Sequence, residues 1–162
     1  MIFLQAFLYS IRLPKKQAMF RLNRIGMDIT VIYMFILIFF VSLPSFINRL
    51  TSAKGLGADM PFFMQLVYFF MFYYLPLTIM LFLLISLIAY IGTLTAKALN
   101  RKIRFAILWK MCAYTTTIPF LVYTIAALIF PVSDAFIWLF IIYSLAFMIK
   151  IITVYPKRKK RK

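Results

Sequence analysis

The sequence predicts an all-α integral membrane protein, a four-span helical bundle with an N-terminal interfacial helix and both termini in the cytoplasm. Of the 162 residues, 65% are apolar and 14% are charged, whereas soluble domains contain about half apolar and about a quarter charged residues. Residues 29–48, 60–96, 111–133 and 135–149 carry no charge. Because a backbone in hydrocarbon must satisfy its own hydrogen bonds, uncharged apolar stretches of about 20 residues are typical of membrane-spanning helices. We therefore expect a single polytopic membrane domain over residues 1–162.

Length and proline position place the first two spans. The first covers residues 29–47. The second uncharged stretch, read as one straight helix, would measure about 45 Å against about 30 Å for the hydrocarbon core. Pro76 suits a first helical turn, so we expect the second span over residues 77–96. The aromatic-rich residues 62–74 then either lie flat as an interfacial helix or continue the second span as a kinked helix.

The third and fourth spans are expected over residues 111–130 and 135–155. Only residues 131–134 connect them, so these two helices must be antiparallel neighbours. Lys150 lies near the end of the fourth span, where its long side chain can carry the ammonium group to the lipid headgroups.

The first thirteen residues are apolar but too short to cross a bilayer. Their cations follow the apolar part instead of preceding it, and no small-residue cleavage site is present, so a signal peptide is not expected. We expect residues 1–13 to form an interfacial helix, with burial against the bundle as the alternative.

Lysine and arginine residues are concentrated on one predicted side. Five precede the first span, five lie between the second and third, and seven lie in or after the end of the fourth. The other side receives only Arg49 and Lys54. The positive-inside rule then places both termini in the cytoplasm.

The C-terminal tail is a run of six cations that we expect to hold the fourth span in place by contact with anionic lipid headgroups. It lacks the interleaved aromatic residues on which nucleic-acid bases stack, so no nucleic-acid partner is expected. The expected lipid contacts are Lys157, Arg158, Lys159, Lys160, Arg161 and Lys162.

Residues that support catalysis or metal binding are scarce. The chain has no histidine and one cysteine, which excludes disulfides, His/Cys metal sets and Cys–His nucleophile pairs. Asp59 and Asp134 lie on the same predicted side and are the one possible carboxylate pair, but Asp134 is better explained as a helix N-cap. Asp28 follows Arg24 by one helical turn, which predicts an anchoring pair at the membrane interface. We expect no enzyme activity, cofactor or metal.

The densest group of hydroxyl residues in the predicted spans is Thr115, Thr116, Thr117 and nearby Pro119. Pro119 cannot donate to the carbonyl of Thr115, and threonine hydroxyls can satisfy backbone groups that a proline leaves free. The cluster therefore favours a kinked packing helix, with a polar groove as the alternative.

Small residues form a packing pattern near the end of the second span. Gly92 and Ala96 are spaced four apart, and Ala89 and Thr93 repeat the spacing beside them, which lets another helix approach closely. We favour packing within the chain over contact with a partner protein.

Two segments carry a further pattern, FLYSIRLPKKQAMFRLNRIG before the first span and LWKMCAYTTTIPFLVY at the third. The positions that matter are Tyr9, Ser10, Pro14, Lys15, Phe20, Arg21, Gly26, Trp109, Thr117, Ile118 and Pro119. At these positions the chain resembles the bacterial membrane family catalogued as domain of unknown function 1189. The resemblance implies a multi-pass protein of the cytoplasmic membrane of a Gram-positive bacterium, sometimes labelled maltodextrin utilisation protein. It supplies no catalytic residues.

Two functions remain open from the sequence. The favoured one is a non-enzymatic accessory or regulatory protein linked to maltodextrin or sugar uptake, whose partners are membrane lipid and a membrane protein such as a sugar transporter. The alternative is a small oligomeric transporter or channel that uses Thr115 to Thr117 as an uncharged polar path. The sequence alone fixes no oligomeric state.

Overall fold

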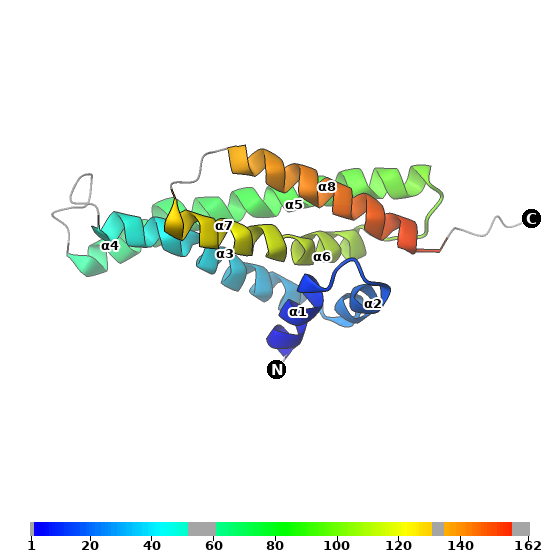
Figure 1. Cartoon of the computed structure of the whole chain (residues 1–162), viewed down its shortest axis with the longest axis horizontal. Helices are drawn as coiled ribbons and strands as arrows, with labels where there is room; N and C mark the ends of the chain where they lie inside the picture. Colours follow the sequence, from blue (N-terminus) through cyan, green and yellow to red (C-terminus); the bar gives the residue numbers. More distant parts are fainter. Residues whose placement is uncertain (1, 52–60, 131–134, 157–162) are drawn as a thin grey trace, which may run out of the picture.

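The computed structural model describes residues 2–51, 61–130 and 135–156, and every regular element in these ranges is helical (Figure 1). The predicted all-α class is therefore confirmed. The elements in chain order are α1 (Ile2–Ile11), α2 (Lys16–Arg24), α3 (Met27–Thr51), α4 (Phe62–Phe69), the π-helical segment η1 (Phe70–Tyr74), α5 (Leu75–Ala98), α6 (Phe105–Thr115), α7 (Thr117–Ile129) and α8 (Ala135–Val154).

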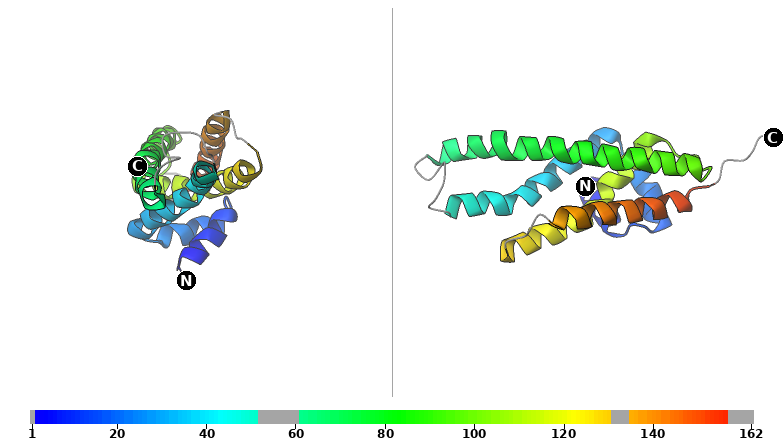
Figure 2. Two further views of the ribbon diagram at one scale, coloured as in Figure 1. Left: turned by 90° about the vertical axis from the view of Figure 1, so that its left-hand side faces the viewer. Right: turned by 90° about the horizontal axis from the view of Figure 1, so that it is seen from above.

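Among the described residues, three helical stretches are long and apolar enough to cross a membrane. They are Met27–Thr51, Phe62–Ala98 and Phe105–Ile129, with 25, 37 and 25 residues. Each extends beyond one of the first three predicted spans. α8 runs alongside them for 20 residues, which corresponds to about 30 Å, and Figure 2 shows the long helices side by side in an elongated bundle.

Residues 62–98 form one continuous helical stretch. The structure therefore favours residues 62–74 as a continuation of the second span over a separate helix that lies flat at the interface. The amide of Leu75 donates to the carbonyl of Phe70, five residues earlier, in the wider turn of η1. This widened turn lies directly before Pro76, which has no amide hydrogen to continue the regular pattern. The whole stretch measures about 55 Å, well beyond a hydrocarbon core of about 30 Å.

The N-terminal residues form two helices where the sequence predicted one. α1 buries Ala6 and Ser10 against the bundle, while Leu4 and Leu8 stay exposed. One face of α1 is therefore buried against the bundle, as the alternative to a purely interfacial helix predicted. α2 is an additional helix that buries Met19 and Leu22.

The predicted Arg24–Asp28 pair is wrong. It required one continuous helix, but α2 ends at Arg24, Ile25 is extended, and α3 begins at Met27. Residues four apart in sequence share a face only within one helix, so the break separates the two side chains. The Asp28 carboxylate lies instead beside Gly26, in the first turn of α3.

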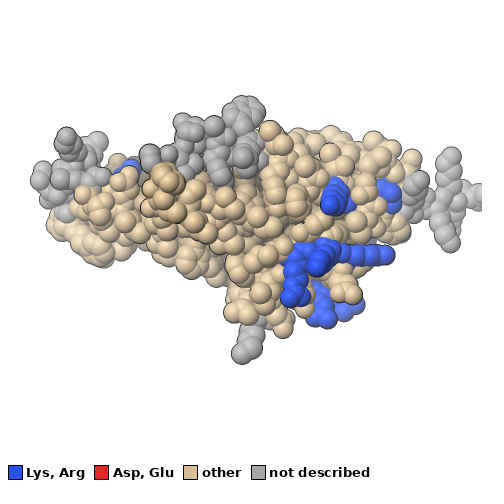
Figure 3. Space-filling model, viewed as in Figure 1, with Lys and Arg blue, Asp and Glu red and all other residues tan. Residues whose placement is uncertain are grey.

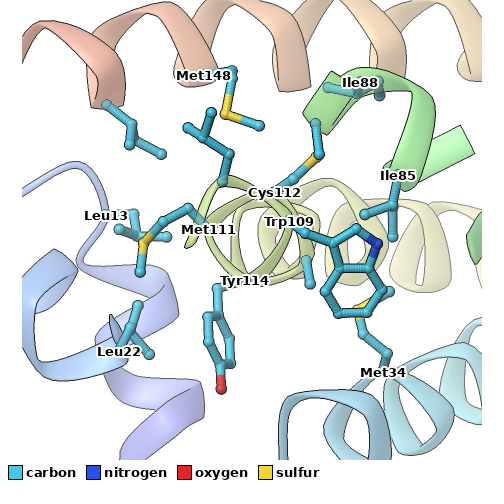
Figure 4. Packing of buried hydrophobic residues seen from close by; sticks show 14 of the residues in the cluster. Leu13, Leu22, Met34, Ile85, Ile88, Trp109, Met111, Cys112, Tyr114 and Met148 are labelled. Carbon is cyan, nitrogen blue, oxygen red and sulfur yellow. The ribbon is translucent and has the colours of Figure 1, made fainter. Parts of the chain in front are cut away.

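α6 forms the centre of the packed core. It contacts α1, α2, α3, α5, α7 and α8. Figure 4 looks along this helix, with Leu22, Met34, Ile88 and Met148 approaching it from four other helices. In the first turn of α7, the rings of Phe120 and Phe140 stack at 5.2 Å and join α7 to α8. The core is thus arranged around α6, which is almost wholly buried from Leu108 onward.

Candidate functional site

The described cations gather at the end of the bundle where α3 and α6 begin and where α5 and α8 end. Figure 3 shows most of the blue side chains in the half of the molecule that holds α1 and α2. We call this region the cationic end. Its members are Arg12, Lys15, Lys16, Arg21, Arg24, Lys97, Arg101, Lys102, Arg104, Lys110 and Lys150. Among the described residues only Arg49, in the last turn of α3, is a cation of the opposite end.

A specific turn after α5 positions Arg101. The amide of Arg101 donates to the carbonyl of Ala96 at 2.8 Å, and that of Asn100 donates to Lys97 at 3.0 Å. Asn100 has a φ of 52°, a left-handed conformation that asparagine tolerates better than most residues. These two hydrogen bonds form a Schellman motif, which ends the helix and satisfies its last carbonyls. The turn directs the chain, and Arg101 with it, towards the end of α8.

Arg101 binds the end of α8. α8 ends at Val154 because Pro156 cannot continue a helix, which leaves terminal carbonyls without partners in the helix. The Arg101 guanidinium donates to the carbonyl of Tyr155. A cation is also favourable there because the helix dipole is negative at its C-terminal end. The ring of Tyr155 lies 6.0 Å from the ring of Phe20, so α2, α8 and the α5–α6 turn meet at this point.

Lys110 performs a similar role at the end of α2. Its ammonium donates to the carbonyls of Asn23 at 2.7 Å and Ile25 at 2.9 Å. Lys110 lies in the second turn of α6, so this contact fixes the N-terminal helices to the central helix. The sequence marked Lys110 only as a cation flanking the third span. Its partners are backbone carbonyls 85 and 87 residues away in sequence, and no pattern in the sequence indicates them.

Hydroxyl groups inside the bundle bond to one another. The hydroxyls of Thr30 and Tyr114 lie 2.9 Å apart, and those of Tyr33 and Thr117 lie 2.8 Å apart. Both pairs join α3 to the α6–α7 stretch, and all four residues are at most 5% exposed. The indole nitrogen of Trp109 donates to Ser86 at 3.0 Å and joins α6 to α5. These buried polar groups therefore hold helices together.

The predicted threonine cluster lies at the joint between α6 and α7. Thr115 donates to the carbonyl of Met111 at 2.8 Å, and Thr116 donates to that of Ala113 at 2.7 Å. Thr115, Thr116 and Thr117 are at most 2% exposed, and Pro119 is buried. Their hydroxyls are thus committed to the backbone of α6 or to Tyr33.

The small residues of α5 face α8. A β-carbon added to Gly92 would lie 3.0 Å from Cγ of Met148. Ala89 and Ala96 are buried on the same face, while Thr93 is half-buried and donates to the carbonyl of Tyr90. The pattern is therefore used for packing within this chain.

An open hollow of about 520 Å³ lies at the end opposite the cationic end. It is lined by the last turns of α3, including Ser45, Asn48 and Thr51, and by α7 from Tyr123 onward. The described residues that line it are uncharged, and no pattern in the sequence indicates the hollow.

Several predicted positions lie outside the described residues. These are the cationic tail Lys157 to Lys162, the carboxylates Asp59 and Asp134, and Lys54. The lipid contacts predicted for the tail, and the pairing of the two carboxylates, therefore stay predictions.

The chain matches a known protein family over part of its length. A sequence model of the family described as "Protein of unknown function (DUF1189)" matches residues 52–152, which include α4 to α7 and most of α8. No curated protein and no solved structure matches the chain. The matched region contains Arg101 and Lys110, and it ends before Tyr155.

Proposed function

The chain belongs to the DUF1189 family, and from this premise we propose that it is a non-enzymatic, four-span protein of the bacterial cytoplasmic membrane that acts by contact with a neighbouring membrane protein. α8 would be the fourth span, because 20 residues suffice to cross about 30 Å of hydrocarbon. The cationic end would face the cytoplasm, and both termini with it, according to the positive-inside rule.

This proposal rests on one observation: polar side chains inside the bundle form hydrogen bonds within the chain itself. Thr30, Tyr33, Tyr114 and Thr117 bond to one another between helices, and Lys110 bonds to backbone carbonyls. The interior of the described bundle therefore keeps few polar groups for a substrate. Apart from the open hollow at the opposite end, the surfaces available to a second molecule are the apolar outer surface and the cationic end.

The exposed face of α5 is the surface we propose for the partner. Met80, Leu83, Leu87 and Tyr90 are each at least 60% exposed, at spacings of three and four residues. This spacing places them in one stripe along the helix, suited to packing against a second helix. We propose a sugar-uptake transporter as the partner to test first, because the family resemblance implies a link to maltodextrin use.

The transporter alternative receives less support. It requires the hydroxyls of Thr115, Thr116 and Thr117 to line a path, but all three are buried and hydrogen-bonded within the bundle. Flux through reconstituted liposomes that is lost in a Thr115/Thr116/Thr117→Val variant would restore this alternative.

Photo-crosslinking in native membranes tests the contact proposal. A photoreactive amino acid at Leu87 should give adducts with a second membrane protein, identified by mass spectrometry. The matched control is Ile125 of α7, which is also 60% exposed and apolar but lies on another helix. Adducts only with lipid or with the chain itself at Leu87 would reject the proposal.

Cysteine labelling tests the proposed topology. Cys112 is the one cysteine of the chain and is buried, so a Cys112→Ala background permits single cysteines to be introduced elsewhere. A membrane-impermeant thiol reagent should label Arg49→Cys in intact cells and Lys15→Cys only after the membrane is opened. The reverse pattern would contradict the orientation.

A further inference from the structure

Two buried hydrogen-bond donors at the junction of α8 with the α5–α6 turn have no acceptor among the described residues. Nε of Arg101 and the hydroxyl of Tyr155 are both shielded from solvent, and neither has a hydrogen-bond partner in the part of the chain that the structure describes. The Tyr155 residue is 7% exposed. Buried polar groups are nearly always paired, and an unpaired one is costly enough to require an explanation.

The same junction holds a positive charge without a described counter-ion. The Arg101 guanidinium is always protonated, and its hydrogen bond to the carbonyl of Tyr155 neutralises no charge. Asp28, the one acid among the described residues, lies beside Gly26 at the start of α3. A partly buried guanidinium is stable when an anion pairs with it. An anion that lies between Nε of Arg101 and the Tyr155 hydroxyl would also give both unpaired donors an acceptor.

We propose that this junction binds a phosphate group, held by the Arg101 guanidinium and the Tyr155 hydroxyl. A guanidinium presents several N–H donors in a plane, which fits phosphate oxygens, and phosphate has enough acceptor oxygens for the tyrosine as well. The chemistry of the surroundings supports phosphate over a single carboxylate. Lys97, Lys102 and Arg104 lie on the same turn or beside it, and concentrated positive charge favours a strongly acidic anion.

Two sources can supply this phosphate. One is the headgroup of an anionic phospholipid in the leaflet that borders the cationic end. The other is a free phosphate or a soluble phosphorylated compound. The half-exposed ring of Phe20 lies beside Tyr155 and gives the site an apolar neighbour. A lipid whose headgroup bound at the junction could place its apolar part against this ring. The site does not depend on the contact function proposed above, since it uses α8 and the α5–α6 turn and leaves the outer face of α5 free.

Binding to the full-length, delipidated protein in detergent tests the proposal in three arms. Inorganic phosphate is titrated by calorimetry, and native mass spectrometry measures retention of phosphatidylglycerol and of diacylglycerol, which lacks the phosphate. A lipid source predicts retention of phosphatidylglycerol without diacylglycerol, whereas a free source predicts binding of inorganic phosphate. Failure of both phosphate-bearing probes, or equal retention of diacylglycerol, would overturn the proposal.

Two variants assign the binding to this junction. Tyr155→Phe removes only the idle hydroxyl and should weaken binding about tenfold, and Arg101→Gln should weaken it about a hundredfold. The matched controls, Tyr90→Phe and Arg49→Gln, change exposed residues of the same types away from the junction and should alter binding less than about twofold. Wild-type affinity in Tyr155→Phe would overturn the assignment.

The melting temperature of the ligand-free Tyr155→Phe variant is a separate test, which does not require Arg101→Gln to fold correctly. Removing a hydroxyl that has no internal partner should leave the melting temperature of ligand-free Tyr155→Phe unchanged or higher. Phosphate or phosphatidylglycerol should then raise the melting temperature of the wild type more than that of the variant. A ligand-free variant that melts below the wild type would show that the hydroxyl serves the fold instead, against the proposal.

Discussion

α6 and α5 lie side by side but meet opposite environments. From Leu108 to Thr115, α6 is buried at every position except the half-buried Lys110, and it touches six other helices. The stretch that contains α5 is more apolar, yet only 28% of its apolar 18-residue segment is buried, against 44% for the corresponding segment of the α6–α7 stretch. In a water-soluble protein the more apolar helix would be the more buried one. The inversion teaches that the outer surface of this fold suits a solvent that accepts apolar side chains.

Polar residues complete the inversion. The interior hydrogen bonds come from Thr30, Tyr33, Tyr114 and Thr117, while the outer face of α5 offers Met80, Leu83 and Leu87. If lipid is the solvent, as proposed above, association cannot be driven by hiding leucine from water, because lipid tails are equally apolar. Close packing and interhelical hydrogen bonds must supply the stability instead. Substitutions in the packed interior should therefore cost more stability than substitutions of exposed residues.

The largest effect is expected from the same truncation on the two helices. Leu108→Ala on α6 leaves a cavity at a position that is 0% exposed, and we expect it to lower the free energy of unfolding by about 3 kcal/mol. Leu83→Ala on α5, at 67% exposure, should cost less than about 0.5 kcal/mol. The measurement is reversible unfolding in mixed micelles. Equal losses would erase the distinction between the two helices.

The inner face of α5 gives the next effect. A leucine at Gly92 would collide with Met148, so Gly92→Leu should cost about 2 kcal/mol by overpacking. Met148→Ala should recover part of this loss in the double variant, and a double-mutant cycle measures the coupling. Additive losses would mean that α5 and α8 do not meet at these residues.

The contact of α6 with α2 should be worth about 1 kcal/mol. Lys110→Met removes the ammonium that binds the carbonyls of Asn23 and Ile25 at the C-terminal end of α2. Hydrogen exchange of residues 16–24 should become faster in this variant. The exposed Lys102→Met is the control and should leave exchange in α2 unchanged. Unchanged protection in Lys110→Met would show that α2 is held by its apolar face alone.

The smallest effect is expected from a single interior hydroxyl. Tyr114→Phe breaks the hydrogen bond to Thr30, and such bonds in membrane proteins contribute about 0.6 kcal/mol on average. Tyr90→Phe on the exposed face of α5 should have no measurable effect. Indistinguishable unfolding curves for the two variants would show that the Thr30–Tyr114 hydrogen bond does not stabilise the fold.

The apolar composition of the sequence was enough to predict three of the long helices. Their ends are harder to predict, because charged residues do not mark where these helices begin and end. The sequence predicts Lys110 just before the third span, whereas the helix begins at Phe105 and Lys110 bonds to the end of α2 from within it. α2 was missed even though Ala18, Met19 and Leu22 have helical spacing, since its many cations resembled a connecting loop.

The interior contacts could not be predicted from the sequence. Thr30 and Tyr114, like Tyr33 and Thr117, are 84 residues apart in the chain. Only the packing of α3 against the α6–α7 stretch brings them together, and the composition of either helix does not determine that packing. The packing role of Gly92 was favoured from its spacing, but its contact with Met148 required the structure.

Quencher accessibility of a spin label tests the central contrast most directly. In the Cys112→Ala background, single labels are placed at Leu83 on the outer face of α5 and at Lys102 on the α5–α6 turn, and the protein is reconstituted in liposomes. The account predicts that the label at position 83 is reached by oxygen dissolved in lipid and not by a water-soluble nickel complex, with the opposite preference at position 102. A label at position 83 that the nickel complex reaches as readily as the one at position 102 would contradict the account.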